Sequence, residues 1–151
     1  VSIFLLNQWY HVAFTYDASA GMATLYLNGE KIAEKTVGSL TFDLNERFCI
    51  GYAYDYDRNR KWNGFMSEVR LWSVARTANQ IRENMMFVDS RSDGLVGYWK
   101  LNGEDIEQRD GVWYVLDQSP NHNDNNGLRG ETGGSQSFVE PTVVDMRVRL
   151  E

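Results

Sequence analysis

The sequence has little of several features that would point to particular classes of protein. It contains one cysteine, Cys49, so no disulfide can form within the chain. Its apolar runs are only a few residues long, so we expect no segment that spans a membrane. Acidic residues outnumber basic ones, 21 against 15, which gives a net charge of −6 and no basic stripe. We therefore expect no nucleic-acid partner.

The chain does contain enough apolar material for one packed core. Hydrophobic residues make up 42% of its 151 positions and aromatic residues 13%, with only two prolines. A chain of this length is typical of a single domain.

Alternating side chains predict strands in the first part of the chain. Residues 9–17 place bulky apolar side chains at every second position. These are Tyr10, Val12, Phe14 and Tyr16. Residues 24–27 and 31–37 predict a hairpin, because the Asn28-Gly29 pair between them suits a two-residue turn with two positive φ angles.

A second pair of strands is predicted at residues 47–52 and 65–72, joined by the long loop 51–64. Loops of this length in compact domains are usually functional or disordered. Later strands are predicted at residues 95–101, 112–116 and 143–150, and the Asn-, Asp- and Gly-rich segment 119–134 is predicted to be a loop.

One short helix is predicted between these strands. Thr77 and Gln80 have the spacing of a capping box. Ala78, Ile81 and Met85 then share one helical face, so the helix is expected to run to Met86. Short strands with a single helix predict an all-β fold, a β-sandwich or jelly roll.

Several ordered motifs resemble the laminin-G-like, concanavalin A-like jelly-roll domains. They are NQWYHVAFTYD, LYLNGEKIA, WNGFMSEVRLWSVARTANQIRENM and LVGYWKLN, within residues 7–101. The segment DQSPNHNDNNG, residues 117–127, is similar to a D-x-S-G-N-x-N-x-G segment that accompanies such domains. The resemblance implies a concanavalin A-like jelly-roll β-sandwich, and it implies binding of carbohydrates or proteins, sometimes through Ca²⁺.

The sequence departs from the family pattern at its start. Family members carry further strands before the W-x-H-V element, and these are missing here. We expect one laminin-G-like sandwich over residues 1–149 without those N-terminal strands, and a cloning remnant at 150–151. Such a sandwich exposes strand edges and apolar surface, so a neighbouring domain or a second chain is expected to cover them.

The sequence predicts no enzyme. Glycosidases need two carboxylates that flank the bond to be cleaved, and the related glucanases carry an E-x-D-x-E strand that this chain lacks. The nearest carboxylates are Asp55 and Asp57 in a loop, and Glu104-Asp105 beside Glu107. His11 and Cys49 lie in predicted strands and are interpreted as structural. His122 has no cluster of metal ligands around it.

The loop 51–64 is the best candidate for a ligand site, because it combines aromatic rings with polar side chains. Rings for stacking on a sugar are Tyr52, Tyr54, Tyr56 and Trp62. Side chains for its hydroxyl groups are Asp55, Asp57, Arg58, Asn59 and Asn63. Two alternatives stay open: Tyr54 and Trp62 cover the end of the sandwich, or the loop binds a protein. The remaining tryptophans, Trp9, Trp72, Trp99 and Trp113, lie in predicted strands and are interpreted as core.

A calcium site is a further candidate. Asp117, Asn123 and Asp124 are the expected ligands, with neighbouring asparagines that offer more oxygens. Pro120 interrupts this run, and a closing glutamate is absent. The alternative is a solvated loop of turn-forming residues.

The residues and the resemblance together predict a non-catalytic carbohydrate-binding module. We expect it to be an accessory part of an exported or surface-attached bacterial protein that processes glycans, and so to be extracellular, periplasmic or on the cell surface. The alternative is a protein-interaction or spacer module that binds no sugar.

Overall fold

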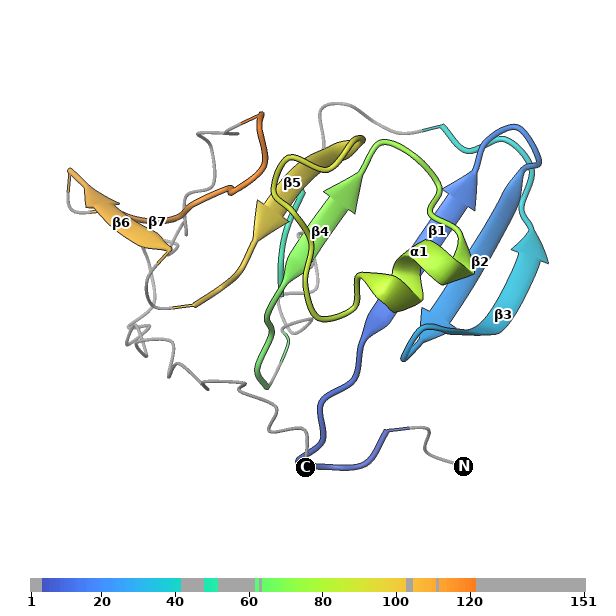
Figure 1. Cartoon of the computed structure of the whole chain (residues 1–151), viewed down its shortest axis with the longest axis horizontal. Coiled ribbons are helices and arrows are strands. Elements are labelled where there is room, and N and C mark those ends of the chain that lie inside the picture. Colours follow the sequence, from blue (N-terminus) through green and yellow to red (C-terminus); the bar gives the residue numbers. More distant parts are fainter. Residues whose placement is uncertain are drawn as a thin grey trace. The chain divides into compact units, whose positions relative to one another are not determined.

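The structure, a computed structural model, describes residues 4–41, 48–51, 62, 64–102, 105–110 and 112–121. The chain divides into two compact units (Figure 1). The first comprises residues 1–61 and 72–94, and the second comprises residues 62–71 and 95–151.

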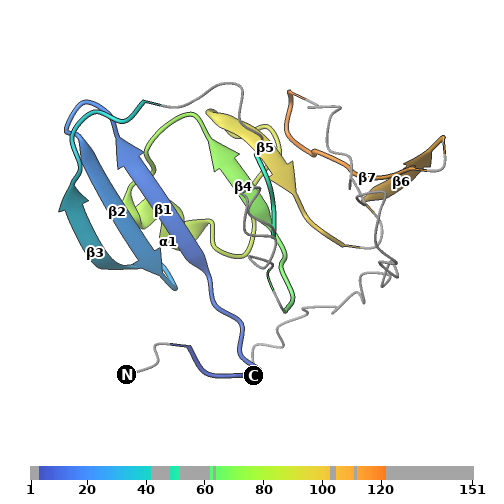
Figure 2. The ribbon, with the colours of Figure 1, turned by 180° about the vertical axis from the view of Figure 1, so that it is seen from behind.

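The first unit is built on an antiparallel sheet of three strands. Strands β1 (Val12–Asp17), β2 (Met22–Leu27) and β3 (Glu30–Thr36) lie side by side in chain order. Figure 2 shows the same three strands from behind. The predicted hairpin is therefore confirmed.

The Asn28-Gly29 turn has the geometry that its sequence predicts. Asn28 has a φ of 50° and Gly29 a φ of 79°, the two positive angles of a tight hairpin turn. The turn also fixes the chain ahead of β1. The backbone N–H of Asn28 donates to the His11 carbonyl at 2.8 Å, and the His11 N–H donates to Asn28 Oδ1 at 3.0 Å. The strand starts at Val12, later than the predicted Trp9.

The two faces of this sheet differ. Helix α1 (Ala78–Glu83) lies over one face in both views (Figure 1 and Figure 2), where Thr24 and Tyr26 are buried. On the other face, Val12 and Phe14 are 55% and 64% exposed. The sequence predicts this apolar face correctly, and what covers it stays a prediction.

Helix α1 begins with the predicted capping box. The Thr77 N–H donates to Gln80 Oε1 at 2.9 Å, and the Gln80 N–H donates to Thr77 Oγ1 at 3.3 Å. The helix ends at Glu83 rather than at Met86. The Arg76 guanidinium, stacked 3.8 Å from the Trp72 ring centre, donates to the Gln80 carbonyl and to the Asn84 side chain at this end. The Gln80 carbonyl thus accepts from the Asn84 N–H at 3.2 Å and from the Arg76 side chain, which ties the last turn of α1 to the segment before it.

The second unit contains two pairs of strands. Strand β4 (Val69–Trp72) pairs with β5 (Leu95–Trp99), and Figure 1 shows the two running antiparallel. Strand β6 (Ile106–Arg109) pairs antiparallel with β7 (Val112–Val115). Buried Leu95, Tyr98, Trp99 and Val115 form the core here.

Two strand predictions differ from the structure at residues with positive φ. The strand predicted from Phe65 starts at Val69, because Glu68 has a φ of 58° and turns the chain out of the extended conformation. Residues 48–51, the described part of the strand predicted at 47–52, are not extended in a sheet, and Gly51 has a φ of 74°. Strand β6 was not predicted, because its polar sequence IEQR shows no apolar alternation.

The tryptophans divide between core and surface. Trp99 is buried, as predicted, and Trp72 is half-buried. The prediction for Trp9 is wrong: its side chain is 44% exposed, because Trp9 lies ahead of β1, outside the sheet. The side chain of Trp113 and the predicted strand 143–150 lie outside the described residues.

Candidate functional site

Two neighbouring aromatic rings of the second unit are exposed, and we call Trp62 and Phe65 the aromatic platform. Their side chains are 60% and 62% exposed. The Trp62 indole Nε1–H donates to the Phe65 carbonyl at 3.3 Å, so one edge of the ring is fixed to the backbone. Gly64 leaves room for this arrangement, since a Cβ there would lie 3.3 Å from Nε1.

Trp62 is the residue of the predicted sugar site that the structure describes. The others lie outside the described residues, and their role stays a prediction. They are Tyr52, Tyr54, Asp55, Tyr56, Asp57, Arg58, Asn59 and Asn63. Phe65 was interpreted as a strand residue. Its position directly after the aromatic loop 51–64 could have indicated that its ring is exposed as well.

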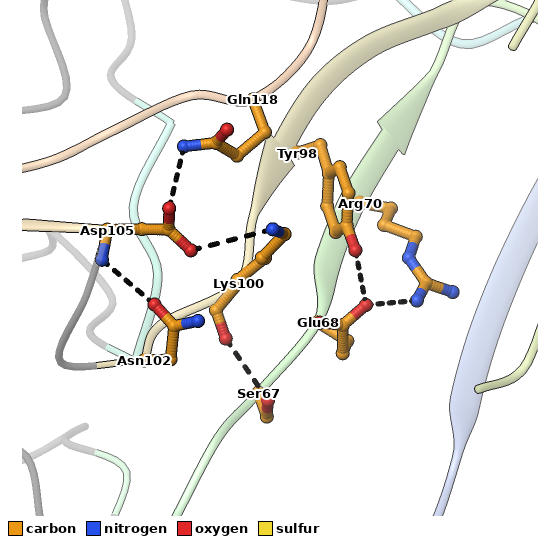
Figure 3. Close-up of polar contacts among 8 residues, drawn as sticks. All are labelled: Ser67, Glu68, Arg70, Tyr98, Lys100, Asn102, Asp105 and Gln118. Carbon is orange, nitrogen blue, oxygen red and sulfur yellow. Dashed lines mark hydrogen bonds and ion pairs between the residues drawn. The ribbon is translucent and has the colours of Figure 1, made fainter. Parts of the chain in front are cut away.

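The backbone beyond the platform is anchored at one carbonyl of the segment that follows β5. The Lys100 carbonyl accepts from the Ser67 hydroxyl at 3.1 Å and from the Glu68 N–H at 3.2 Å (Figure 3). These two hydrogen bonds hold Ser67 and Glu68 in place directly before β4 begins at Val69.

Glu68 is also held by its side chain. Tyr98 Oη donates to Glu68 Oε2 at 2.7 Å, and Arg70 Nη2 donates to the same oxygen. Figure 3 shows Tyr98 and Arg70 converging on this carboxylate, with the Arg70 guanidinium carbon 5.3 Å from the Tyr98 ring centre. A left-handed conformation costs a residue such as glutamate about 1–2 kcal/mol, and these bonds to the side chain offset that cost.

This carboxylate cluster is largely withdrawn from water. The exposed fraction is 3% for Tyr98, 7% for the Arg70 side chain and 26% for the Glu68 side chain. Breaking this ion pair would leave the charge of the buried Arg70 side chain without the carboxylate beside it, so the pair holds both side chains in place.

The pKa of Tyr98 gives a prediction for the pH dependence of stability. Burial, followed by the hydrogen bond to Glu68, raises the pKa of Tyr98 from 10.0 to about 12. The folded state therefore favours the neutral phenol, so this contribution to stability is complete below pH 10 and disappears as the pH rises to about 12. Across that window we expect Tyr98 to lower the free energy of unfolding by up to about 1.4 kcal/mol per pH unit.

Urea unfolding at a series of pH values from below 10 up to 12 measures this effect. Tyr98→Phe is the control, since it keeps the ring and removes the titrating hydroxyl. The wild-type protein should lose stability more steeply with pH than this variant. Equal slopes for the two proteins would contradict the assignment.

A second cluster of the same unit surrounds Asp105. Its Oδ1 accepts from Gln118 Nε2 at 3.0 Å, its Oδ2 lies 3.8 Å from Lys100 Nζ, and its N–H donates to Asn102 Oδ1 at 2.9 Å (Figure 3). Nearby, Glu107 forms an ion pair with Arg109 at 2.8 Å, and hydrogen bonding to Arg109 lowers the pKa of Glu107. Asp105 and Glu107, two of the carboxylates that come nearest to the glucanase pattern in the sequence, thus each lie beside a cation.

Asp117 has a structural role in this unit. Its buried Oδ1 accepts from the Tyr98 and Ser119 N–H groups, both at 2.8 Å, and its Oδ2 accepts from the Ser119 hydroxyl at 2.9 Å. The carboxylate thereby joins the segment after β7 to the edge of β5. These contacts explain why D-x-S occurs at the start of the segment DQSPNHNDNNG.

The calcium prediction remains open. Its other ligands, Asn123 and Asp124, lie outside the described residues. Within the part of the chain that the structure describes, no group of three His, Cys, Asp or Glu side chains could hold a metal ion. Cys49, interpreted as a buried thiol, is half-buried.

The antiparallel sheets with one short helix define an all-β jelly-roll protein. Residues 2–82 match the model of the Concanavalin A-like lectin/glucanases superfamily. That match covers more than half of the chain, so the chain belongs to this superfamily, and the concanavalin A-like prediction is confirmed.

The chain is also similar to a protein of solved structure and to curated proteins. A candidate carbohydrate-binding protein from Bacteroides ovatus ATCC 8483 has a crystal structure with 45% sequence identity and a TM-score of 0.66, which covers 78% of this chain and 34% of the other. Pappalysin-1 from Mus musculus is 31% identical over 84 residues, and the protein from Homo sapiens is 30% identical. That stretch is 54% of this chain and 5% of pappalysin-1, so the chain spans a small part of these relatives. No helix among the described residues is long and apolar enough to cross a membrane.

Proposed function

We propose that this chain is a non-catalytic carbohydrate-binding module of an exported or surface-attached bacterial protein that processes glycans. The observation that carries the proposal is the exposed Trp62 ring, fixed at its edge and open to a ligand. The 45% identity to a candidate carbohydrate-binding protein from a bacterium supports the same function. An extracellular, periplasmic or surface location and a bound Ca²⁺ are parts of this proposal.

The chemistry of the platform suits a sugar. A pyranose presents C–H groups on one face, and these pack against an aromatic ring. Because the indole N–H already donates to the Phe65 carbonyl, Trp62 offers its face rather than a hydrogen bond. Polar side chains of the neighbouring loop would then bind the hydroxyl groups of the sugar.

A second candidate function is protein binding. The exposed apolar face of β1, with Val12 and Phe14, favours this alternative, because contiguous apolar surface marks interaction sites. The two functions differ in their surface: sugar binding uses the aromatic platform of the second unit, and protein binding uses the sheet of the first.

A glycan-array screen in calcium and in EDTA tests the proposed function. We expect binding to at least one glycan, and we expect Trp62→Ala to weaken it about tenfold, equivalent to about 1.4 kcal/mol. The matched control is Phe87→Ala, which removes another exposed ring, from the first unit. Loss of the signal in EDTA would support the calcium site.

Two outcomes would contradict the proposal. Absence of binding to any glycan would favour the protein-binding or spacer function. Glycan binding that Trp62→Ala leaves unchanged, in a variant that keeps its far-ultraviolet circular dichroism, would place the sugar site elsewhere.

A further inference from the structure

The conformation of Glu68 is the most unusual feature near the aromatic platform. Glutamate rarely adopts a positive φ, and here the angle is 58°. Strained backbone persists only where the surrounding structure enforces it, and it is concentrated at functional sites. The left-handed conformation of Glu68 is therefore expected to position residues close to it in the chain.

The enforcing contacts come from β4 and β5. Tyr98 of β5 and Arg70 of β4 both donate to Glu68 Oε2, and both side chains are buried (Figure 3). The Glu68 carboxylate cannot move away without breaking its ion pair with the buried Arg70 side chain. The carboxylate is thus fixed to the paired strands, and the backbone of Glu68 is fixed with it.

The turn at Glu68 determines where the chain leaves the strands. Regular pairing of β4 starts only at Val69. Ahead of it, Ser67 and Glu68 are held by the Lys100 carbonyl at 3.1 and 3.2 Å. Only Met66 separates Phe65 from these anchored residues, and the Phe65 carbonyl accepts the Trp62 indole N–H at 3.3 Å. Hydrogen bonds and a short stretch of backbone therefore join the half-buried Glu68 carboxylate to both exposed rings.

We propose that Glu68 is the positioning residue of the aromatic platform, and that its bonds to Tyr98 and Arg70 hold Trp62 and Phe65 ready for stacking on a sugar. The role in sugar binding rests on the proposed function, and the positioning of the rings does not. A ring that is fixed before the ligand arrives loses less conformational entropy on binding. Glu68 thus acts on affinity without touching the ligand.

Three variants of Glu68 separate its side chain from its backbone. Glu68→Ala removes the carboxylate and keeps the backbone strain. Glu68→Gly also removes the carboxylate, but glycine adopts a positive φ readily, so it relieves the strain. Glu68→Gln keeps an oxygen that accepts from Tyr98 and Arg70, so it is the conservative variant that should restore the platform.

The full chain labelled with 5-fluorotryptophan reports on the rings without any ligand. Its five tryptophans give separate fluorine signals, and Trp62→Phe identifies that of Trp62. We expect Glu68→Ala and Glu68→Gly to shift or broaden the Trp62 signal, and Glu68→Gln to leave it near the wild-type position. The signal of Trp9, which belongs to the first unit, is the internal control and should stay in place.

The same variants are then compared for binding to a glycan that the wild-type protein binds. We expect Glu68→Ala and Glu68→Gly to weaken binding about fivefold, and Glu68→Gln to bind as the wild type does. An unchanged Trp62 signal in folded Glu68→Gly overturns the positioning role, whether or not a glycan binds. A shifted Trp62 signal without glycan binding by the wild type supports the positioning role and overturns the proposed function. If Glu68→Ala does not fold, Glu68→Gly and Glu68→Gln still give these outcomes.

Discussion

Asp117→Ala is expected to lower the free energy of unfolding by about 3–5 kcal/mol. The change removes the acceptor of two backbone N–H groups, those of Tyr98 and Ser119, and of the Ser119 hydroxyl. All of these groups are buried, and each buried donor left without an acceptor costs about 1–3 kcal/mol. Urea unfolding followed by circular dichroism measures the loss.

Two further variants make this result specific. Asp93→Ala removes an exposed carboxylate and should change stability by less than about 0.5 kcal/mol. Asp117→Asn keeps one oxygen that accepts from both N–H groups, so it should lose clearly less than the alanine variant. A loss for Asp117→Ala no larger than that for Asp93→Ala would contradict the structural role.

The same experiment examines the calcium prediction. The hydrogen bonds of Asp117 act with or without a metal, so the loss of stability should be the same in EDTA. A loss that appears only in the presence of Ca²⁺ would instead identify Asp117 as a metal ligand, because a ligand that binds the native state stabilises it.

Gly97→Ala is expected to lower the free energy of unfolding by about 3 kcal/mol. Residues 97 and 99 share one face of β5, and the Trp99 indole folds back across Gly97. A Cβ on residue 97 would lie 2.3 Å from Trp99 Cη2 and 2.6 Å from Cζ3, far inside contact distance. Because Trp99 is buried, the ring has no free space to move into, and overpacking of this kind destabilises a core.

A double-mutant cycle separates this clash from other effects of the methyl group. Gly97→Ala combined with Trp99→Leu should cost less than the sum of the two single changes, since leucine no longer reaches residue 97. Gly38→Ala is the control for backbone strain alone: it has a φ of 72° and no atom within 4 Å of its Cβ. Its loss should be about 1–2 kcal/mol. Additive losses in the cycle would show that the Trp99 contact is not the cause.

The elements that the sequence predicted correctly are those stabilised by near neighbours. Asn28-Gly29 carries its turn geometry in two adjacent residues. Thr77 and Gln80 cap α1 across a single helical turn. The alternation at Val12 and Phe14 likewise fixed which side chains share a face of β1, because strand geometry places every second residue together.

The candidate site was predictable in part. The aromatic loop between two predicted strands indicated Trp62, whose ring is exposed. Phe65 was not predicted as a site residue, because its alternation with Ser67 fits a strand equally well. The strand begins later than this pattern indicates, at Val69, since Glu68 adopts a left-handed conformation. The donors that hold that conformation are Arg70, two residues away, and Tyr98 on another strand, and the contact with Tyr98 cannot be read from the neighbouring sequence.

By itself the sequence determined the all-β class, the hairpin, the capped helix and the apolar face of the first sheet, because each depends on contacts between residues a few positions apart. Only the tertiary structure decided that Asp117 accepts from the backbone of β5 and that Trp9 lies on the surface. It also decided that β6 pairs with β7 despite its polar sequence. These outcomes depend on which distant groups meet and which stay in water, and a pattern of neighbouring residues does not contain that information.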